Sequence, residues 1–153
     1  EKRHRELSRA LHPDKFASSG PAERQMALGK TVEVNEGWRT VRDPIKRAEA
    51  LFALAEIPVG ERAEPKPTPM FLMDMLEQRE ALEEAKTARN AAKVESLAAG
   101  IRARVTGAEK ALAEGFAKGA DASLVAKLGE LRFYKRFLEE VSAIQDEMHD
   151  GAA

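Results

Sequence analysis

The chain has 153 residues, 43% of them hydrophobic and 33% charged, with 25 basic and 26 acidic side chains and a formal net charge of −1. This length and composition indicate one or two small domains, and the absence of cysteine excludes disulfides and thiolate metal sites. No apolar run is long enough to span a membrane. Aromatic residues make up only 5% of the chain, and alanine, leucine, glutamate, lysine and arginine dominate, which favours helices over strands.

Residues 1–11 are predicted to form a basic helix. Lys2, Arg5 and Arg9 recur at helical spacing on one face, whereas leucines lie on another. The first 15 residues hold five basic and three acidic side chains, a local net charge of +2. The chain begins at Glu1, without a methionine and already in helical register, so we interpret it as a fragment.

The segment that follows, LHPDKF at residues 11–16, is a predicted helix stop. Proline disfavours the α conformation of the residue before it, so a helix that reaches Leu11 should end near His12. Pro13 also fixes its own φ and removes a backbone donor, so we expect a rigid corner that holds the His12 imidazole and the Asp14 carboxylate outward. No serine or cysteine nucleophile accompanies this pair in a recognisable motif, which argues against catalysis. A plain helix boundary with a surface histidine is the alternative interpretation.

Two further helices are predicted before the middle of the chain. Pro21 starts a helix over residues 21–41, and Asp43 as a cap with Pro44 starts a shorter helix over residues 44–55. The helices at residues 1–11 and 21–41 are expected to lie antiparallel, and the two bury too little surface to be stable alone, so an upstream helix or the rest of the chain should cover them. The residues expected to face inward are Ala27, Thr31, Val34, Trp38 and Val41 in the first helix and Ala48, Leu51, Phe52 and Ala55 in the second.

Four of the seven prolines lie in residues 56–69, and we interpret this stretch as a semi-rigid linker. This local enrichment in proline makes the stretch the best candidate for a domain boundary in the sequence. We therefore predict a first domain at residues 1–56, a proline-rich linker at residues 57–69 and a helical bundle at residues 70–150.

Three helices are predicted in the bundle. The first covers residues 69–89, the second covers residues 90–118, and the last ends near residue 148 after a turn at Gly119 and a cap at Asp121. Helices joined by such short turns indicate an all-α fold with an antiparallel three-helix bundle. The expected seam residues are Val94, Ala98, Ile101, Val105, Ala108 and Leu112 in the second helix and Leu124, Leu128, Leu131, Tyr134, Leu138, Val141 and Met148 in the last.

The first bundle helix carries more apolar side chains than one buried stripe requires. Phe71, Met75 and Leu82 cluster in a narrow arc that can face the core. The apolar residues outside this arc either cover the linker or first domain, or they form an exposed apolar groove rimmed by carboxylates, which is typical of a docking site. The residues outside the arc are Leu72, Met73 and Leu76, with Glu77, Glu80 and Glu84 beside them, and Phe133 and Phe137 lie off the seam of the last helix.

Several runs resemble the HscB family of J-type co-chaperones, which act in iron–sulfur cluster assembly. The matching runs are HPDKF at residues 12–16, NEGWRTV at 35–41, DPIKRAE at 43–49 and FLMDMLEQRE at 71–80. The first run alone is typical of the broad J-domain class, and the FLM stretch after a proline linker narrows the resemblance to this family. Members begin with a further helix, so the resemblance implies a J-domain helical hairpin truncated at its N-terminus.

The resemblance implies two protein partners and neither a cofactor nor a metal. The chain would stimulate the ATPase of a specialised Hsp70 (HscA-type) and deliver the iron–sulfur cluster scaffold protein (IscU-type) to it, without bond chemistry of its own. The residues expected to bind the Hsp70 are His12, Pro13, Asp14, Arg5, Arg9 and Lys15. The residues expected to bind the scaffold are Leu72, Met73, Leu76, Glu77, Glu80, Glu84 and Phe133.

Two other functions are compatible with the sequence. The first is a J-protein that serves a general Hsp70 with another client, and the second is a helical structural adaptor in which the corner is incidental. An enzyme has no recognisable motif to support it, and nucleic acid is not an expected partner because the basic segment is short and lacks interleaved aromatic residues. No membrane partner is expected, and the lack of a cysteine-rich N-terminal extension favours a bacterial-type, cytoplasmic protein.

Overall fold

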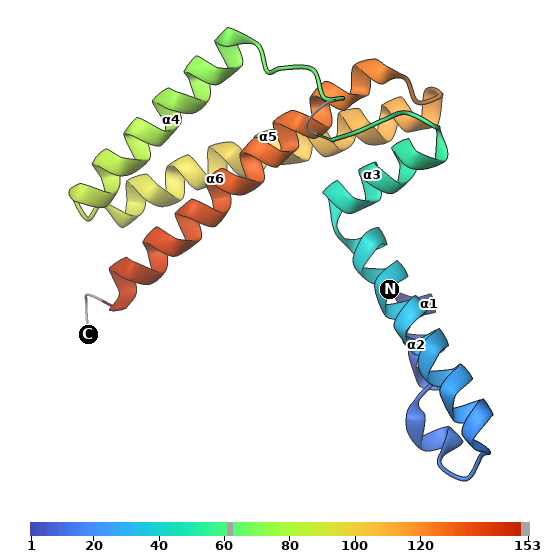
Figure 1. The fold of residues 1–153 in the computed structure, drawn as a ribbon. Coiled ribbons are helices and arrows are strands. Elements are labelled where there is room, and N and C mark those ends of the chain that lie inside the picture. Colours follow the sequence, from blue (N-terminus) through green and yellow to red (C-terminus); the bar gives the residue numbers. More distant parts are fainter. Residues whose placement is uncertain (61–62, 151–153) are drawn as a thin grey trace. The chain divides into compact units, whose positions relative to one another are not determined.

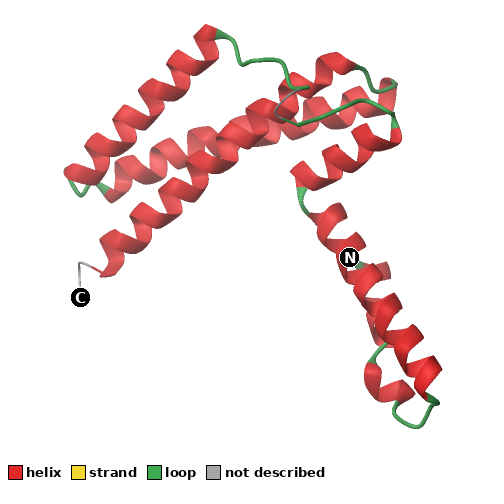
Figure 2. Cartoon of the chain, in the orientation of Figure 1, coloured by secondary structure: helices red, strands yellow, loops and turns green. Residues whose placement is uncertain are grey.

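This computed structural model describes residues 1–60 and 63–150, which contain α-helices, two short 3-10 helices and no strand. Figure 1 shows the order of the helices along the chain, and Figure 2 shows that only turns and loops join them. The predicted all-α fold is therefore confirmed.

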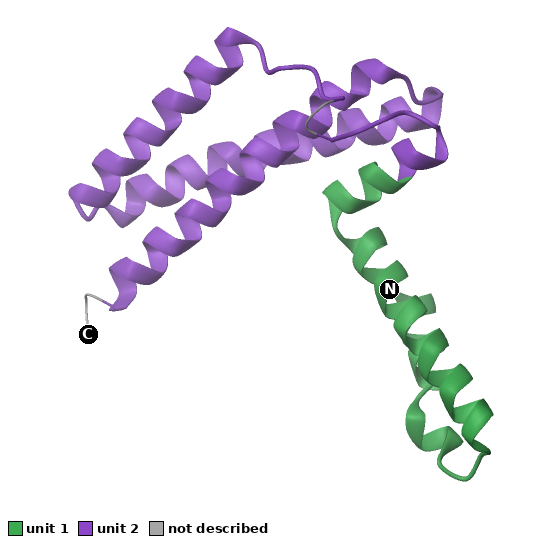
Figure 3. Cartoon of the chain, viewed as in Figure 1, with its two compact units in different colours: residues 1–50 green, residues 51–153 purple. Residues whose placement is uncertain are grey.

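The chain forms two compact units, residues 1–50 and 51–153 (Figure 3). The division falls within α3 (Pro44–Leu54), because the last turn of this helix belongs to the second unit. There the Phe52 side chain is fully buried, and its ring centroid lies 4.8 Å from that of Phe116 in an edge-on arrangement. The boundaries predicted from proline content stay a prediction.

The first unit consists of α1 (Lys2–Ala10), the 3-10 helix η1 (Pro13–Phe16) and α2 (Pro21–Arg42), followed by the start of α3. Local sequence sets these boundaries. Pro21 occupies the first turn of α2, where its missing N–H costs no hydrogen bond. The Asp43 carboxylate caps α3 by accepting hydrogen bonds from two backbone N–H groups at 2.9 and 3.1 Å, as predicted.

An aromatic stack and a polar contact join α1 to α2. The His4 ring stacks on the Trp38 indole with a centroid distance of 4.8 Å, and His4 Nε2 lies 3.2 Å from Asn35 Oδ1. Ala27 is buried, and Trp38, predicted as a core residue, is half-buried. This pair of helices therefore holds together by stacking and hydrogen bonds more than by a closed apolar core.

Three residues predicted to face inward are exposed, and those predictions were wrong. Val41 is exposed because it lies beyond Trp38, which already contacts His4 in the first turn of α1. In α3, Leu51 is exposed because the neighbouring Phe52 makes the buried contact instead. Ala55 is exposed because α3 has ended at the residue before it.

The second unit contains the helical bundle α4 (Pro69–Thr87), α5 (Ala91–Lys118) and α6 (Val125–Asp150), with the 3-10 helix η2 (Ala122–Leu124) before α6. A polar cap precedes α4, α5 and η2. The side chains of Thr68, Asn90 and Asp121 each accept a backbone hydrogen bond, at 3.2, 3.0 and 2.7 Å respectively. The helix starts predicted from these capping residues are therefore confirmed.

Contacts between α4 and α6 fix the direction of the helices. The contacting pairs, in order along both helices, are Phe71 with Phe133, Arg79 with Glu140, and Lys86 with Glu147. From one pair to the next, the residue number increases in both helices, so α4 and α6 run in the same direction. The intervening α5 runs antiparallel to both (Figure 1), so the bundle has the predicted up-down-up arrangement.

The bundle core is apolar. The predicted seam of α5 is confirmed except at Val105, which is half-buried, and Met75 and Leu82 of α4 are buried as predicted. Near the end of α5, Gly115 allows η2 to approach closely. A Cβ at this position would collide with the Leu124 side chain, so a larger residue would force that side chain to shift.

The core side of α6 differs from the prediction. Phe137, placed off the seam by the sequence pattern, is fully buried, whereas Leu138 is only half-buried. The buried face steps from Tyr134 to Phe137 and then to Val141, because steps of three and of four residues both keep a side chain on one face of a helix. The other departures are Val125 and Ile144, which are buried, and Leu124 and Met148, which are half-buried.

Candidate functional site

The polar corner between α1 and α2 forms as the sequence predicts. The α1 helix ends at Ala10, and the N–H of Leu11 donates to the carbonyl of Leu7 at 2.9 Å to close its last turn. His12 leaves the helical conformation at φ −59° and ψ 132°, and Pro13 begins η1. The chain therefore changes direction within a few residues, at the position of the proline.

The corner presents its polar side chains to solvent. His12 Nδ1 lies 3.4 Å from Asp14 Oδ2, and both side chains are exposed, as is Pro13. Because solvent screens an exposed pair, this contact contributes little to stability. The imidazole and the carboxylate are therefore available to another protein, and the exposure expected from the sequence is observed.

One hydrogen bond ties the corner to the longer helix. Thr31 Oγ1 donates to the carbonyl oxygen of Leu11 at 3.1 Å and lies 2.9 Å from the carbonyl oxygen of Ala27. The Leu11 carbonyl belongs to the end of α1, where backbone acceptors lack partners within the helix. The Thr31 hydroxyl therefore supplies a partner for it and fixes the corner against α2.

The predicted basic residues near the corner are all exposed. Arg5 forms an ion pair with Glu1, and this guanidinium lowers the pKa of the Glu1 carboxyl below its usual value. Arg9 and Lys15 make no side-chain ion pair within the part of the chain that the structure describes. Of the three, Arg9 and Lys15 are thus the cations without a competing carboxylate among the described residues.

A second candidate surface, the α4 patch, consists of Leu72, Met73 and Leu76. These side chains are 44%, 64% and 57% exposed, although each is apolar. The structure therefore places all three outside the bundle core, as the sequence pattern predicted. The acidic residues predicted beside them are likewise exposed, namely Glu77, Glu80 and Glu84.

Phe133 of α6 contacts the first turn of α4. Its ring packs edge-on against Phe71 at a centroid distance of 5.5 Å, and the side chain is half-buried. The centroid of the Phe71 ring in turn lies 5.7 Å from that of the Tyr134 ring. Phe133 is therefore anchored to α4 through Phe71, the residue that precedes Leu72 in the sequence. That Phe133 belongs to the same binding surface as the α4 patch stays a prediction.

An ion pair that the sequence pattern did not reveal fixes the start of α4. Arg104 of α5 donates to both carboxylate oxygens of Asp74, with one of the two contacts at 3.1 Å. Hydrogen bonding to Asp74 raises the pKa of Arg104 above its usual value, so the guanidinium stays charged. A planar two-point contact of this kind restricts rotation of α4. It therefore holds the α4 patch outward.

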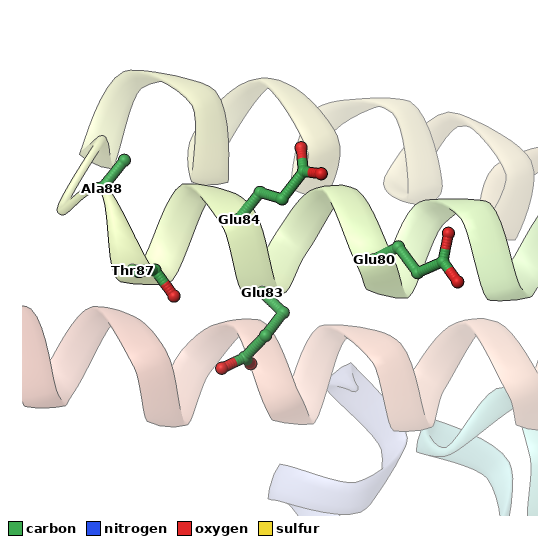
Figure 4. A pocket seen from close by; sticks show the side chains of 5 residues that line it. All are labelled: Glu80, Glu83, Glu84, Thr87 and Ala88. Atoms are coloured by element: carbon green, nitrogen blue, oxygen red, sulfur yellow. The ribbon is translucent and has the colours of Figure 1, made fainter.

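The acidic end of α4 borders an open hollow of about 550 Å³. Glu80, Glu83 and Glu84 line it together with Thr87 and Ala88. Figure 4 shows Glu80 and Glu84 on one side of the helix and Glu83 on the other. Of these carboxylates, Glu83 was absent from the predicted set, although its acidic neighbours in sequence could have suggested it. Such an arrangement attracts the basic side chains of a partner protein.

Other site classes find no support among the described residues. Within residues 1–60 and 63–150, no group of three or more histidine or acidic side chains is arranged to hold a metal ion. Over the same residues, none of the helices combines the length and the apolar character required to cross a bilayer. The two candidate surfaces are thus the polar corner and the α4 patch.

Comparison with known proteins gives consistent matches. A family model described as the HSCB C-terminal oligomerisation domain matches residues 67–142. A co-chaperone protein HscB homolog of Burkholderia multivorans is 34% identical over 140 residues, which cover 92% of this chain and 80% of the relative. A protein of the same name from Shewanella oneidensis is 35% identical over 156 residues, covering 97% of this chain and 87% of the relative.

Two solved structures share the fold. The chaperone HscB from Vibrio cholerae matches with a TM-score of 0.83 at 27% identity, over 96% of this chain and 86% of that protein. The human co-chaperone protein HscB also matches with a TM-score of 0.83, over 94% of this chain and 72% of that protein. At 22% identity, this second match bears on the fold alone.

Proposed function

Because this chain belongs to the HscB family of co-chaperones, we propose that it is an adaptor between two proteins. It stimulates the ATPase of a specialised Hsp70 (HscA-type) and delivers the iron–sulfur cluster scaffold protein (IscU-type) to that Hsp70. The chain is a co-chaperone rather than an enzyme, in agreement with the names of its relatives. The observation that carries the proposal is the exposure of both candidate surfaces.

The polar corner is the proposed contact with the Hsp70. Its three residues, His12, Pro13 and Asp14, are exposed and held in a fixed turn, which is the geometry a docking loop requires. Arg5 and Arg9 on α1 and Lys15 in η1 add positive charge to this surface. An acidic surface on the partner would be attracted to these cations, which raises the encounter rate more than the final affinity.

The α4 patch is the proposed contact with the scaffold. Its apolar residues supply area that is removed from water on binding, and Met73 has the flexibility to adapt to a partner. The carboxylates of Glu77, Glu80 and Glu84 favour a partner whose complementary edge is basic. Phe133 completes the surface from α6.

Tethering explains why one chain carries both contacts. In this proposal residues 1–56 act as the J-domain, residues 57–69 are the linker and residues 70–150 hold the scaffold. A scaffold bound to the same chain as the Hsp70-binding corner has a high local concentration at the Hsp70. A bacterial-type, cytoplasmic protein is the setting that the family resemblance implies for this activity.

The proposal is tested by separating the two contacts. Titration of an HscA-type Hsp70 with the chain should raise its ATPase rate, and an IscU-type scaffold should raise it further. The His12→Gln variant removes the imidazole from an exposed position, so it should abolish stimulation while calorimetry shows unchanged scaffold affinity. Loss of both activities together would contradict the division of labour between the surfaces. Absence of stimulation by the unsubstituted chain would favour a purely structural adaptor.

A general Hsp70 is the control partner. If the chain stimulates such an Hsp70 and does not bind the scaffold, it serves another client through the same corner. In that case the role proposed for the α4 patch fails and that of the corner stands.

A further inference from the structure

A pocket between the proline-rich segment and α6 is not used by either proposed contact. This linker pocket has a volume of about 230 Å³, and residues 64–67 cover one side of it. Lys66, Arg132 and Arg136 give it three cations, against the single carboxylate of Glu64. Phe133 supplies an aromatic wall. The pocket thus combines positive charge with an apolar surface.

The one carboxylate in the pocket is already satisfied. Glu64 forms an ion pair with Arg132, and its Oε1 accepts a hydrogen bond from the N–H of Gly60 at 3.2 Å. Lys66 and Arg136, by contrast, have no hydrogen bond or ion pair to another side chain in the described part of the chain. The Glu64 contact therefore holds the segment against α6, and two positive charges remain for an incoming group.

The pocket lies next to the start of α4, which it meets through Phe133. Phe133 lines the pocket, and its ring also packs against Phe71, which precedes Leu72 in α4. The exposed carboxylates of α4 follow the patch toward the other end of the same helix. A partner that lies along this surface therefore meets cations, then apolar side chains, then carboxylates. Such a charge gradient distinguishes the two directions in which a partner could bind.

We propose that the linker pocket receives a carboxylate of the scaffold protein and thereby sets the direction in which the scaffold lies on the α4 patch. This inference rests on the proposed function, since it names a second contact for the same partner. The guanidinium of Arg136 offers planar two-point hydrogen bonding to a carboxylate, and Lys66 adds a mobile point charge. An amide oxygen could accept a hydrogen bond from either group, but it would lack the charge attraction and the two-point contact of a carboxylate.

The experiment compares two charge-reversal variants of the full chain in binding to an IscU-type scaffold. Lys66→Glu combined with Arg136→Glu should weaken binding about tenfold or more at low salt, and the loss should shrink as salt screens the charges. The matched control, Lys93→Glu combined with Lys118→Glu, makes the same change in net charge at exposed positions of α5. It should leave the affinity within about twofold. Circular dichroism checks that both variants keep their helices.

A second measurement identifies the bound group on the scaffold. Single Asp→Lys and Glu→Lys changes across the scaffold should include one that restores affinity for the reversed pocket and weakens affinity for the unsubstituted chain. Equal affinity of the pocket variant and the control at every salt concentration would overturn the inference while leaving the proposed function intact, provided that the unsubstituted chain binds. Failure of the unsubstituted chain to bind the scaffold would overturn both.

Discussion

Replacing both Leu72 and Leu76 by alanine should weaken scaffold binding and leave the bundle folded. These leucines lie on the exposed side of α4, and their removal opens no cavity in the core formed by Met75 and Leu82. Alanine is the strongest helix former, so the substitutions do not oppose the helix. Phe133 is a less suitable target because its ring packs against Phe71, and truncation would mix a loss of stability with a loss of binding.

The size of the effect follows from the exposed fractions. Complete burial of a leucine side chain contributes about 1.5–3 kcal/mol. Leu72 is 44% exposed and Leu76 is 57% exposed, so binding can bury only about half of each side chain. The pair should therefore contribute about 1.5–3 kcal/mol, which corresponds to a roughly 10- to 150-fold increase in Kd.

Isothermal titration calorimetry with an IscU-type scaffold measures this change, and thermal unfolding monitors the fold. A matched control replaces two exposed leucines outside α4, Leu28 and Leu54, which are 59% and 83% exposed. The control should bind like the unsubstituted chain. Equal affinity of the α4 variant and the control would refute the assignment of the α4 patch as the scaffold contact.

Two further predictions concern the bundle itself. Arg104→Met should lower the free energy of unfolding by about 1–2 kcal/mol, because the half-buried Asp74 carboxylate loses its paired partner. Arg102→Met, which breaks an exposed pair with Glu95, should cost less than about 0.5 kcal/mol in the same denaturant titration, and equal losses would contradict the role of Arg104. Burial raises the pKa of Tyr134 in the folded chain above the pKa of a tyrosine in the unfolded chain, which is near 10. The buried neutral Tyr134 therefore contributes its full stabilisation below about pH 10, and this stabilisation is lost as pH rises through the pKa of the folded state. Tyr134→Phe should therefore lose less stability than the unsubstituted chain between about pH 10 and pH 12, and identical alkaline unfolding curves would exclude this effect.

The helix boundaries could be predicted from sequence because their causes are local. Pro21 and Pro69 occupy first turns, and Asp43 and Asn90 accept hydrogen bonds within three residues of themselves. The outward face of α4 was also predictable, since it carries more apolar side chains than one stripe can bury. These features need only the residues of a single element. For that reason one sequence contains enough information to find them.

Features that depend on two distant segments were missed or misplaced. Asp74 and Arg104 are 30 residues apart, and nothing in either neighbourhood identifies the other as its partner. Phe137 and Leu138 are adjacent and both apolar, so the pattern alone did not distinguish which one enters the core. The linker pocket could not be predicted because residues 64–67 have no helical period that indicates what they cover.

The central claim is that the corner and the α4 patch function together because one chain carries both. It is tested by mixing two variants, His12→Gln with the corner impaired and Leu72→Ala/Leu76→Ala with the patch impaired, in an ATPase assay of an HscA-type Hsp70 at limiting scaffold. Tethering predicts that the mixture fails to restore the scaffold-dependent stimulation given by the unsubstituted chain. Full stimulation by the mixture would show that the two surfaces act independently, and it would contradict the adaptor.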